Sequence, residues 1–203
     1  MPDSQHRQQW WLMGKLFNRR TQVLETAVDS DDSLLHVAIA GGSLSEWDLF
    51  GLQWEARIEE LTSVLSKSGV QFLSVYPYGP AIDDHKVPVK SFDRQLSVNG
   101  VQVSIDSSTD GRERICSALV HREDSEILSE KFLDQQLFGR AGNPDLVVVL
   151  GPANCLPRSL VWELAYSEIV FVEQTWSLLS VEKIESAILE YSQRHRRFGG
   201  VDT

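Results

Sequence analysis

The chain has 203 residues, of which 42% are hydrophobic and 24% charged, which is the composition of an ordinary globular domain. Its formal charge of −10, with acidic residues spread along most of the chain, argues against a nucleic-acid-binding protein. Cys116 and Cys155 show neither CxxC spacing nor a Cys/His cluster, so neither a disulfide framework nor a zinc site is indicated, and we expect a reducing, cytoplasmic setting. Because no apolar run reaches the ~20 residues of a membrane span and no signal-peptide core is present, we expect a soluble or at most peripheral protein.

Residues 1–33 are predicted to form an amphipathic helix followed by an acidic linker. The stretch RQQWWLMGKLFNRR, residues 7–20, carries large apolar residues at helical spacing, with basic residues beside them. One interpretation is a terminal helix docked on its own domain. The other is peripheral contact of these aromatic and basic residues with an anionic membrane surface. The linker DSDDS leads into the main domain, residues 34–203.

The first part of this domain has the pattern of a β-α-β unit. LLHVAIAGG is typical of a buried strand that leaves a sheet at glycines. Ser43 and Glu46 form an S-x-x-E capping box before a helix whose apolar residues recur from Trp54 to Leu65. Gly69 ends this helix, and VQFLSVYPYG is the second strand. The unit implies a parallel sheet with a right-handed crossover.

Strand and helix patterns continue to alternate in the rest of the chain. Residues 79–97 are rich in Pro, Asp and Lys and are predicted to be loop, whereas VNGVQVSID is predicted to be a strand or hairpin arm with its turn at Asn99-Gly100. PDLVVVLG is the clearest central strand. The other expected elements are helices around 111–122 and 125–138, a helix in SLVWELAYSE, a strand in IVFVEQ and a final helix over 180–197. We therefore predict an α/β fold with a central, mostly parallel sheet flanked by helices.

Chemistry in such a fold sits beyond the C-terminal ends of the strands, which directs attention to the loops after Ile39, Tyr76 and Leu150. His36 opens a buried strand, so we interpret it as structural rather than as an acid–base catalyst. The serines of GGSLS lack a G-x-S-x-G elbow, and the stretch lacks the G-K-S/T of a P-loop. Hydrolase and nucleotide-binding functions are therefore disfavoured.

Four stretches carry a more specific signal. HVAIAGGSLSEW, PDLVVVLGPANCL, LVWELAYSEIVF and RRFGG cover most of residues 35–200. Their order and spacing resemble the cis-prenyltransferase family, which includes undecaprenyl diphosphate synthase, and the pair W-x-x-A-Y-S-E and R-R-F-G-G is the most diagnostic. The resemblance implies the family's fold. In active members it also implies the addition of isopentenyl diphosphate to an allylic diphosphate with Mg²⁺.

At several functional positions this chain departs from the active members that it resembles. The metal-binding Asp of the family's first motif falls on Gly42, and the Arg of that motif falls on Glu46. Two diphosphate-binding arginines fall on Val149 and Cys155, with Arg158 three positions further on. Because such a site needs a carboxylate for the metal and arginines for the diphosphate, the resemblance implies that this chain alone binds no metal or cofactor.

Together these departures resemble another branch of the family, the non-catalytic, Nogo-B receptor-like subunits of heteromeric cis-prenyltransferases. LGP at residues 150–152 and the shortened VSIDSSTDGRERICSAL are similar to that branch. In the family, the C-terminal segment of one subunit completes the active site of its partner through an R-x-G motif. The matching residues here are Arg197 and Gly199, followed by Gly200.

For these tail residues the resemblance implies a role in trans. They would bind isopentenyl diphosphate at a shared site whose Mg²⁺ belongs to the catalytic partner. Arg offers a forked cation to a diphosphate, and Gly lets its backbone N–H approach closely. The alternative is that the cations and glycines of RHRRFGG simply end a helix.

The resemblance also implies a dimer interface at residues 159–168, the following strand and the tail. Its candidate residues are Trp162, Tyr166, Glu168 and Phe198, since aromatic anchors are favoured at interfaces. The alternative places both Trp162 and Tyr166 in the core, and Glu168 also matches the family's metal-associated Glu. Two other functions stay open, an atypical prenyl diphosphate synthase or cyclase with a rearranged site and an isoprenoid-binding pseudoenzyme.

Overall fold

The computed structural model describes residues 33–82, 84–87, 92–120, 122 and 127–194. The predicted helix over residues 7–20 and the tail residues Arg197, Phe198, Gly199 and Gly200 lie outside the described residues, so the predictions about them stay predictions. Within the described ranges, no helix combines the length and apolar character that crossing a bilayer requires.

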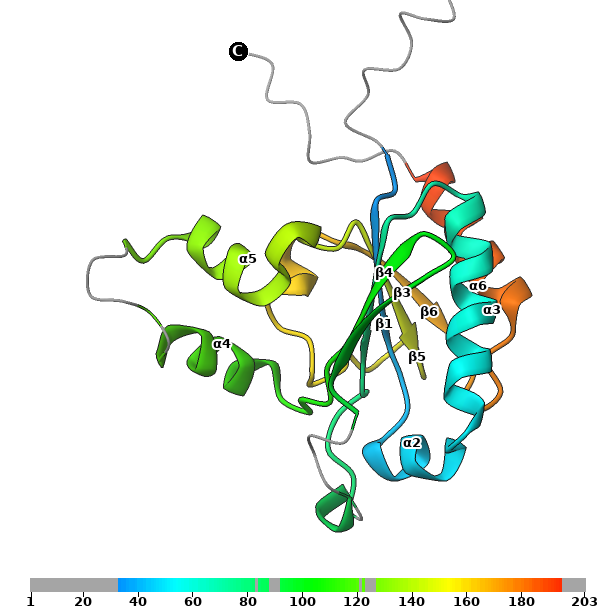
Figure 1. Ribbon diagram of the computed structural model, residues 1–203, viewed down its shortest axis with the longest axis horizontal. Helices are drawn as coiled ribbons and strands as arrows, with labels where there is room; N and C mark the ends of the chain where they lie inside the picture. Colours follow the sequence, from blue (N-terminus) through cyan, green and yellow to red (C-terminus); the bar gives the residue numbers. More distant parts are fainter. Residues whose placement is uncertain (1–32, 83, 88–91, 121, 123–126, 195–203) are drawn as a thin grey trace, which may run out of the picture. The chain divides into compact units, whose positions relative to one another are not determined.

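A six-stranded sheet in the order β3-β4-β2-β1-β5-β6 forms the centre of residues 34–194 (Figure 1). The strands are β1 (His36–Ala40), β2 (Phe72–Tyr76), β3 (Arg94–Val98), β4 (Val101–Ile105), β5 (Leu146–Leu150) and β6 (Glu168–Val172). All neighbouring strands pair in parallel except β3, which is antiparallel to β4. The predicted α/β fold with a mostly parallel sheet is therefore confirmed.

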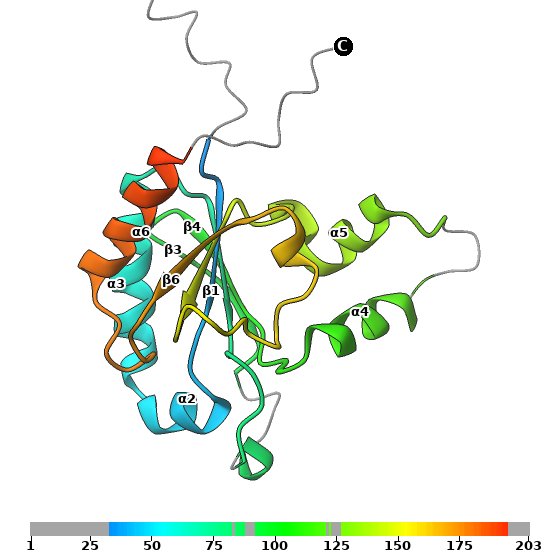
Figure 2. The ribbon, with the colours of Figure 1, turned by 180° about the vertical axis from the view of Figure 1, so that it is seen from behind.

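Helices cover both faces of this sheet. They are α2 (Leu44–Phe50), α3 (Gln53–Lys67), α4 (Gly111–Val120), α5 (Glu130–Phe138) and α6 (Val181–Gln193), with short 3₁₀ turns η1 (Asp84–Lys86), η3 (Gly139–Ala141) and η4 (Glu163–Ala165). Figures 1 and 2 show α3 and α6 on one face and the α4–α5 pair on the other. The predicted final helix is present as α6, and it buries Ile184 and Tyr191.

The single helix predicted after the Ser43–Glu46 capping box is in fact two helices. The capping box is confirmed, because the Ser43 hydroxyl accepts a hydrogen bond of 3.1 Å from the backbone N–H of Glu46. However, α2 ends at Phe50, and Gly51 adopts a positive φ of 50° before α3 begins. A left-handed residue interrupts the helical hydrogen bonds, which lets the chain change direction at this glycine.

Two predicted element assignments are wrong. Residues 79–97 were predicted to be loop, but the described part includes most of the edge strand β3, whose residues are mainly exposed and polar and so lack an apolar signal. Residues 159–168 were predicted to be a helix, but they form only the 3₁₀ turn η4 before β6 begins. Here the buried Glu163 carboxylate accepts a hydrogen bond of 3.2 Å from the Val161 N–H, which competes with regular helix.

The two faces of the sheet differ in what they bury. Toward α3 and α6 the sheet contributes to a large apolar core that includes the rings of Trp47, Trp54 and Trp176, with Trp47 edge-on to Trp54 and Trp176 tilted against it. Toward α4 and α5 the apolar cluster is small and contains alanines, Tyr76 and Val149. The weaker apolar packing on this second face leaves room for a polar groove, described below.

Candidate functional site

The loop after β1 is the predicted place for chemistry, and it is closely packed. Gly42 has a positive φ of 73°, and a Cβ at this position would lie 2.9 Å from Nε1 of Trp47 and 3.0 Å from Cβ of Trp176. The Trp47 indole donates to the Gly41 carbonyl at 2.8 Å, which holds its ring against the loop. Residue 42 therefore has no space for a carboxylate side chain in this backbone conformation.

Two carboxylates near this loop are already engaged by N–H and O–H donors. The Glu46 carboxylate accepts from the N–H and the hydroxyl of Ser177, at 3.1 and 3.2 Å. Asp84, which is buried, accepts from the N–H and hydroxyl of Ser45 with one oxygen and from the Ala81 N–H with the other. Both carboxylates therefore fasten the loop to neighbouring segments.

These two carboxylates are poorly placed to bind the Mg²⁺ that the resemblance implies for active members. Mg²⁺ in proteins is held by carboxylate oxygens in near-ideal octahedral geometry, together with several waters. Both oxygens of Asp84 are occupied by backbone and hydroxyl donors. Among the residues that the structure describes, no group of three or more His, Cys, Asp or Glu side chains could hold a metal ion. The assignment of Mg²⁺ to a partner stays a prediction.

The second predicted diphosphate position is not built for an anion either. Val149 is fully buried in β5, whereas Cys155 is exposed in the loop that follows. Arg158 is exposed too, and its guanidinium pairs with Asp110 at 3.2 Å. Arg112 bonds the same carboxylate at 2.9 Å, and these hydrogen bonds hold the pKa of Asp110 well below its usual range. The Arg158 guanidinium is therefore already paired with a carboxylate of the same chain, which makes it less available to a diphosphate.

Glu168 lies at the N-terminal ends of the parallel strands, whereas Gly42 lies beyond the C-terminal end of β1. Glu168 begins β6 and pairs in register with Leu146, which pairs with Val37 near the start of β1. Gly42 follows the other end of β1. Within one chain, the structure therefore does not bring Glu168 to the loop after β1. Its carboxylate instead accepts a hydrogen bond of 2.9 Å from Arg194, at the end of α6.

The two candidate interface aromatics are not core residues. Tyr166 is 72% exposed. Trp162 is half-buried, and its indole N–H donates to the Asp134 carboxylate at 2.7 Å. The core alternative is therefore wrong, and the interface role of these residues stays a prediction.

His36 has the structural role that its position in a buried strand predicts. It is only 1% exposed, and its ring nitrogens lie 2.8 Å from the Gly142 carbonyl and 2.9 Å from the Ser74 hydroxyl. Because a carbonyl can only accept, Nδ1 donates to Gly142, and in the neutral ring Nε2 accepts from Ser74. Burial lowers the pKa of His36, which favours this neutral form.

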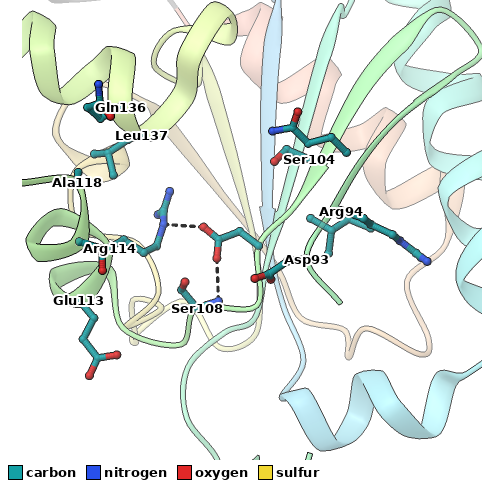
Figure 3. A pocket seen from close by; sticks show the side chains of 13 residues that line it. Asp93, Arg94, Ser104, Ser108, Glu113, Arg114, Ala118, Gln136 and Leu137 are labelled. Carbon is teal, nitrogen blue, oxygen red and sulfur yellow. Dashed lines mark hydrogen bonds and ion pairs between the residues drawn. The ribbon is translucent and has the colours of Figure 1, made fainter. Parts of the chain in front are cut away.

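Sequence reasoning did not anticipate a polar groove between the sheet and the α4–α5 pair. Two adjoining cavities of about 640 and 700 Å³ share the side chains of Gln95, Ser104, Asp106, Gln136 and Leu137. On the sheet side, Ser74, Gln95, Gln102 and Ser104 contribute to the lining. Figure 3 shows Ser104 on the sheet, facing the α4–α5 side that carries Gln136 and Leu137. Amide and hydroxyl groups are thus prominent on the sheet face that helices cover elsewhere with apolar contacts.

A buried ion-pair network forms one wall of this groove. Arg114 projects from α4 toward the sheet, as Figure 3 shows, and pairs with Asp106 at 2.9 Å. It also pairs with the fully buried Glu163, and it donates to the Tyr76 hydroxyl at 3.2 Å. Burial raises the pKa of Tyr76 to about 12. No sequence signal links Arg114 to Glu163, because 49 residues separate them.

The fold and these motifs define a protein of the cis-prenyltransferase class. The family model described as "Putative undecaprenyl diphosphate synthase" matches residues 87–199, which is more than half of the chain. The chain therefore belongs to this family.

Similar proteins carry related names. An isoprenyl transferase of Listeria innocua is 36% identical over 94 residues, which cover 46% of this chain and 37% of that protein. An isoprenyl transferase of Listeria monocytogenes is 28% identical over 140 residues, or 64% and 56% of the two chains. The ditrans,polycis-undecaprenyl-diphosphate synthase of Micrococcus luteus is 33% identical over 75 residues, or 36% and 30%. The chain thus spans between 30% and 56% of the length of these three relatives.

Two solved structures share the fold. A probable undecaprenyl diphosphate synthase from Campylobacter jejuni matches with a TM-score of 0.58 and 20% identity, over 82% of this chain and 98% of that one. The lavandulyl diphosphate synthase of Lavandula x intermedia matches with a TM-score of 0.59 and 16% identity, over 84% of this chain and 100% of that one.

Proposed function

We propose that this chain is a non-catalytic subunit of a heteromeric cis-prenyltransferase. It pairs with a catalytic subunit that elongates an allylic diphosphate with isopentenyl diphosphate to a polyprenyl diphosphate. Its C-terminal Arg197 and Gly199, followed by Gly200, complete the partner's active site, where Mg²⁺ is bound. The observation that carries the proposal is the packing around Gly42, where Trp47 and Trp176 fill the space that a metal-binding carboxylate would need.

The second diphosphate position supports the same proposal. Val149, in β5, is fully buried and belongs to the small apolar cluster. An arginine there would place an unpaired cation in an apolar environment, which is strongly unfavourable. The two positions that the resemblance assigns to metal and diphosphate are thus both committed to packing.

The polar groove also favours a product tunnel in the partner rather than in this chain. A growing prenyl chain needs an apolar channel, because burying it against amides and hydroxyls would leave those groups without hydrogen-bond partners. Gln95, Gln102 and Ser104 lie on the sheet side of this groove, and Arg114 and Asp106 line its first cavity. These polar groups alternate with apolar side chains such as Phe72 and Leu137, so the lining suits an isoprenoid less well than an apolar channel would.

The test is incorporation of labelled isopentenyl diphosphate onto farnesyl diphosphate in the presence of Mg²⁺. It compares this chain alone, a catalytic partner with the M-D-G-N-x-R-W pattern from the same genome alone, and the two co-expressed. We expect activity only from the mixture. Arg197→Ala should lower turnover about 100-fold while the complex still forms, because an active-site cation is lost, whereas the neighbouring Arg196→Ala should have little effect.

Other outcomes would support the other functions. Turnover by the isolated chain would contradict the proposal and indicate an atypical prenyl diphosphate synthase or cyclase with a rearranged site. Saturable binding of farnesyl diphosphate without turnover, in the absence of any partner, would instead indicate an isoprenoid-binding pseudoenzyme.

A further inference from the structure

The end of α6 is fixed to the sheet by one arginine. The helix ends at Gln193, and Arg194 leaves it with extended backbone angles, φ −82° and ψ 120°. One nitrogen of the Arg194 guanidinium donates to the Glu168 carboxylate at 2.9 Å and to the Ile169 carbonyl at 2.8 Å. The other donates to the Glu190 carboxylate, one turn back on α6.

This arrangement fixes the position of residue 194 relative to the sheet. The acceptors come from two elements, α6 and the start of the edge strand β6, so the planar guanidinium has one orientation that satisfies them all. The side chains of Arg194 and Glu168 are only 35% and 28% exposed, which limits screening of the pair by water. Hydrogen bonding to Glu168 raises the pKa of Arg194, so its guanidinium remains charged.

Glu168 is the counter-ion of Arg194 in this structure. In the family that the chain resembles, the matching Glu is associated with the metal. Here one of its oxygens accepts a hydrogen bond from Arg194, and Glu168 begins β6, at the end of the strands away from Gly42. Arg194 stands three residues before Arg197 in the sequence. Three residues span at most about 10 Å, so the position of residue 194 limits where residue 197 can reach.

We propose that Arg194 is a positioning residue for the C-terminal R-x-G motif and that Glu168 acts through Arg194 rather than as a metal ligand. This inference rests on the proposed function. Anchoring the chain at residue 194 confines the motif to a smaller volume and so raises its effective concentration at the partner's active site. Loss of the anchor should therefore weaken binding of isopentenyl diphosphate in the complex.

The anchor itself can be tested in the isolated full-length chain by limited trypsin digestion. The rate of cleavage of the bond after Arg194 is followed by mass spectrometry, which separates this product from those of Arg196 and Arg197. Glu168→Gln should accelerate this cleavage about fivefold, because the guanidinium is released more often to the protease. As the control, Glu185→Gln removes an exposed charge from α6, the helix that precedes Arg194, and should leave the cleavage rate unchanged. Equal rates in Glu168→Gln and wild type would overturn the inference.

The positioning role is tested in the co-expressed complex. Glu168→Gln and Arg194→Ala should raise KM for isopentenyl diphosphate about fivefold with little change in kcat, and Arg194→Lys should recover part of the loss. The Mg²⁺ concentration for half-maximal activity should not change. A shift of that concentration in Glu168→Gln would show a metal ligand and overturn the inference.

The two proposals fail in different ways. An inactive wild-type mixture would overturn the proposed function and, with it, the catalytic part of this inference, whereas the cleavage rates would still decide whether the anchor exists. An active mixture whose KM is unaffected by Arg194→Ala would overturn the positioning role and leave the proposed function standing.

Discussion

Arg114 is the buried residue that ties α4 to the sheet. Its partners are Asp106 after β4, Glu163 in η4 and the Tyr76 hydroxyl at the end of β2. A buried ion pair is a weak source of stability compared with apolar packing. Removal of one partner, however, leaves the other as an uncompensated charge. The attachment of α4 should therefore depend on Arg114 and Glu163 together.

We expect Arg114→Met to lower the free energy of unfolding by about 3–5 kcal/mol, because it strands the Glu163 carboxylate in the interior. The double variant Arg114→Met/Glu163→Met should recover much of this loss. Arg112→Met removes an exposed guanidinium from the same helix and should change the free energy by less than about 0.5 kcal/mol. Urea unfolding measures all three variants, and equal losses in Arg114→Met and Arg112→Met would contradict the expectation.

His36 gives the fold a predictable dependence on pH. Burial lowers its pKa in the folded state below the ordinary value of 6.5, so in this range the unfolded chain binds more protons. The stabilisation is complete above the unfolded pKa and is lost as pH falls toward the folded pKa. The free energy of unfolding should therefore decrease below about pH 6.5, and His36→Gln should flatten this decrease. His85→Gln, at an exposed position, is the control, and the same slope in both variants would show that His36 is not the source.

At the scale of elements, the loop after β1 illustrates how packing can close a site. Gly42 and Gly69 both have positive φ, 73° and 83°. A Cβ at Gly69 would meet nothing within 4 Å, whereas at Gly42 it would meet the Trp47 and Trp176 side chains. Comparing a substitution at Gly69 with the same substitution at Gly42 therefore separates the cost of backbone strain from the cost of steric overlap.

We expect Gly69→Ala to lower the free energy of unfolding by about 1–2 kcal/mol, through backbone strain alone. Gly42→Ala should lower it by at least about 1 kcal/mol more, because the Trp47 ring has to move from the loop. The difference between the variants, measured by urea unfolding, reports the packing contribution. Equal effects would mean that the loop can accommodate a side chain, which would remove the main support for the proposed lack of catalysis.

The elements that could be predicted from the sequence are those whose signal is local. β1, β2, β5 and β6 are apolar runs, and the start of α2 follows from Ser43 capping. The edge strand β3 was missed because its exposed, polar residues give no apolar pattern. Residues 159–168 have a helical pattern, but a tertiary contact decides their structure, since Glu163 bonds both Arg114 and the Val161 N–H.

The candidate site shows the same contrast between features with a local sequence signal and features that depend on tertiary contacts. The departures at Gly42 and Val149 could be located from motif alignment. The reasons why residue 42 has no space for a carboxylate, and why residue 149 is unfavourable for an arginine, are visible only in three dimensions. The Arg194–Glu168 contact joins residues that are 26 positions apart, and the Arg114–Glu163 contact joins residues 49 positions apart. A single sequence contains no signal for such pairings.

At the scale of the domain, the two faces of the sheet have different chemistry. The face under α3 and α6 is closed by an apolar core, whereas Gln95, Gln102 and Ser104 lie on the other face beneath α4 and α5. Polar groups on the sheet side of a groove disfavour uptake of a hydrocarbon chain. The domain therefore has a cavity of sufficient size for a ligand, but its apolar lining, which includes Phe72, Leu137 and Phe138, is interrupted by polar side chains.

We expect farnesyl diphosphate to leave the thermal unfolding midpoint of the isolated chain unchanged within about 1 °C. A ligand present at 100 times its Kd would add about 2.7 kcal/mol of stability and shift the midpoint by several degrees. Differential scanning fluorimetry measures the shift, with the catalytic partner as the positive control. A saturable shift would favour the isoprenoid-binding pseudoenzyme.

The position of β1 in the strand order has a consequence during synthesis. β1 lies between β2 and β5, so that Val37 pairs with both Leu73 and Leu146. On the ribosome, the second of these partners emerges only after more than a hundred further residues. Until then the nascent chain presents an apolar strand with one unpaired edge, which is the surface that chaperones bind and that aggregation exploits. A chain whose synthesis stops before residue 145 should therefore be retained by chaperones rather than released as a folded intermediate.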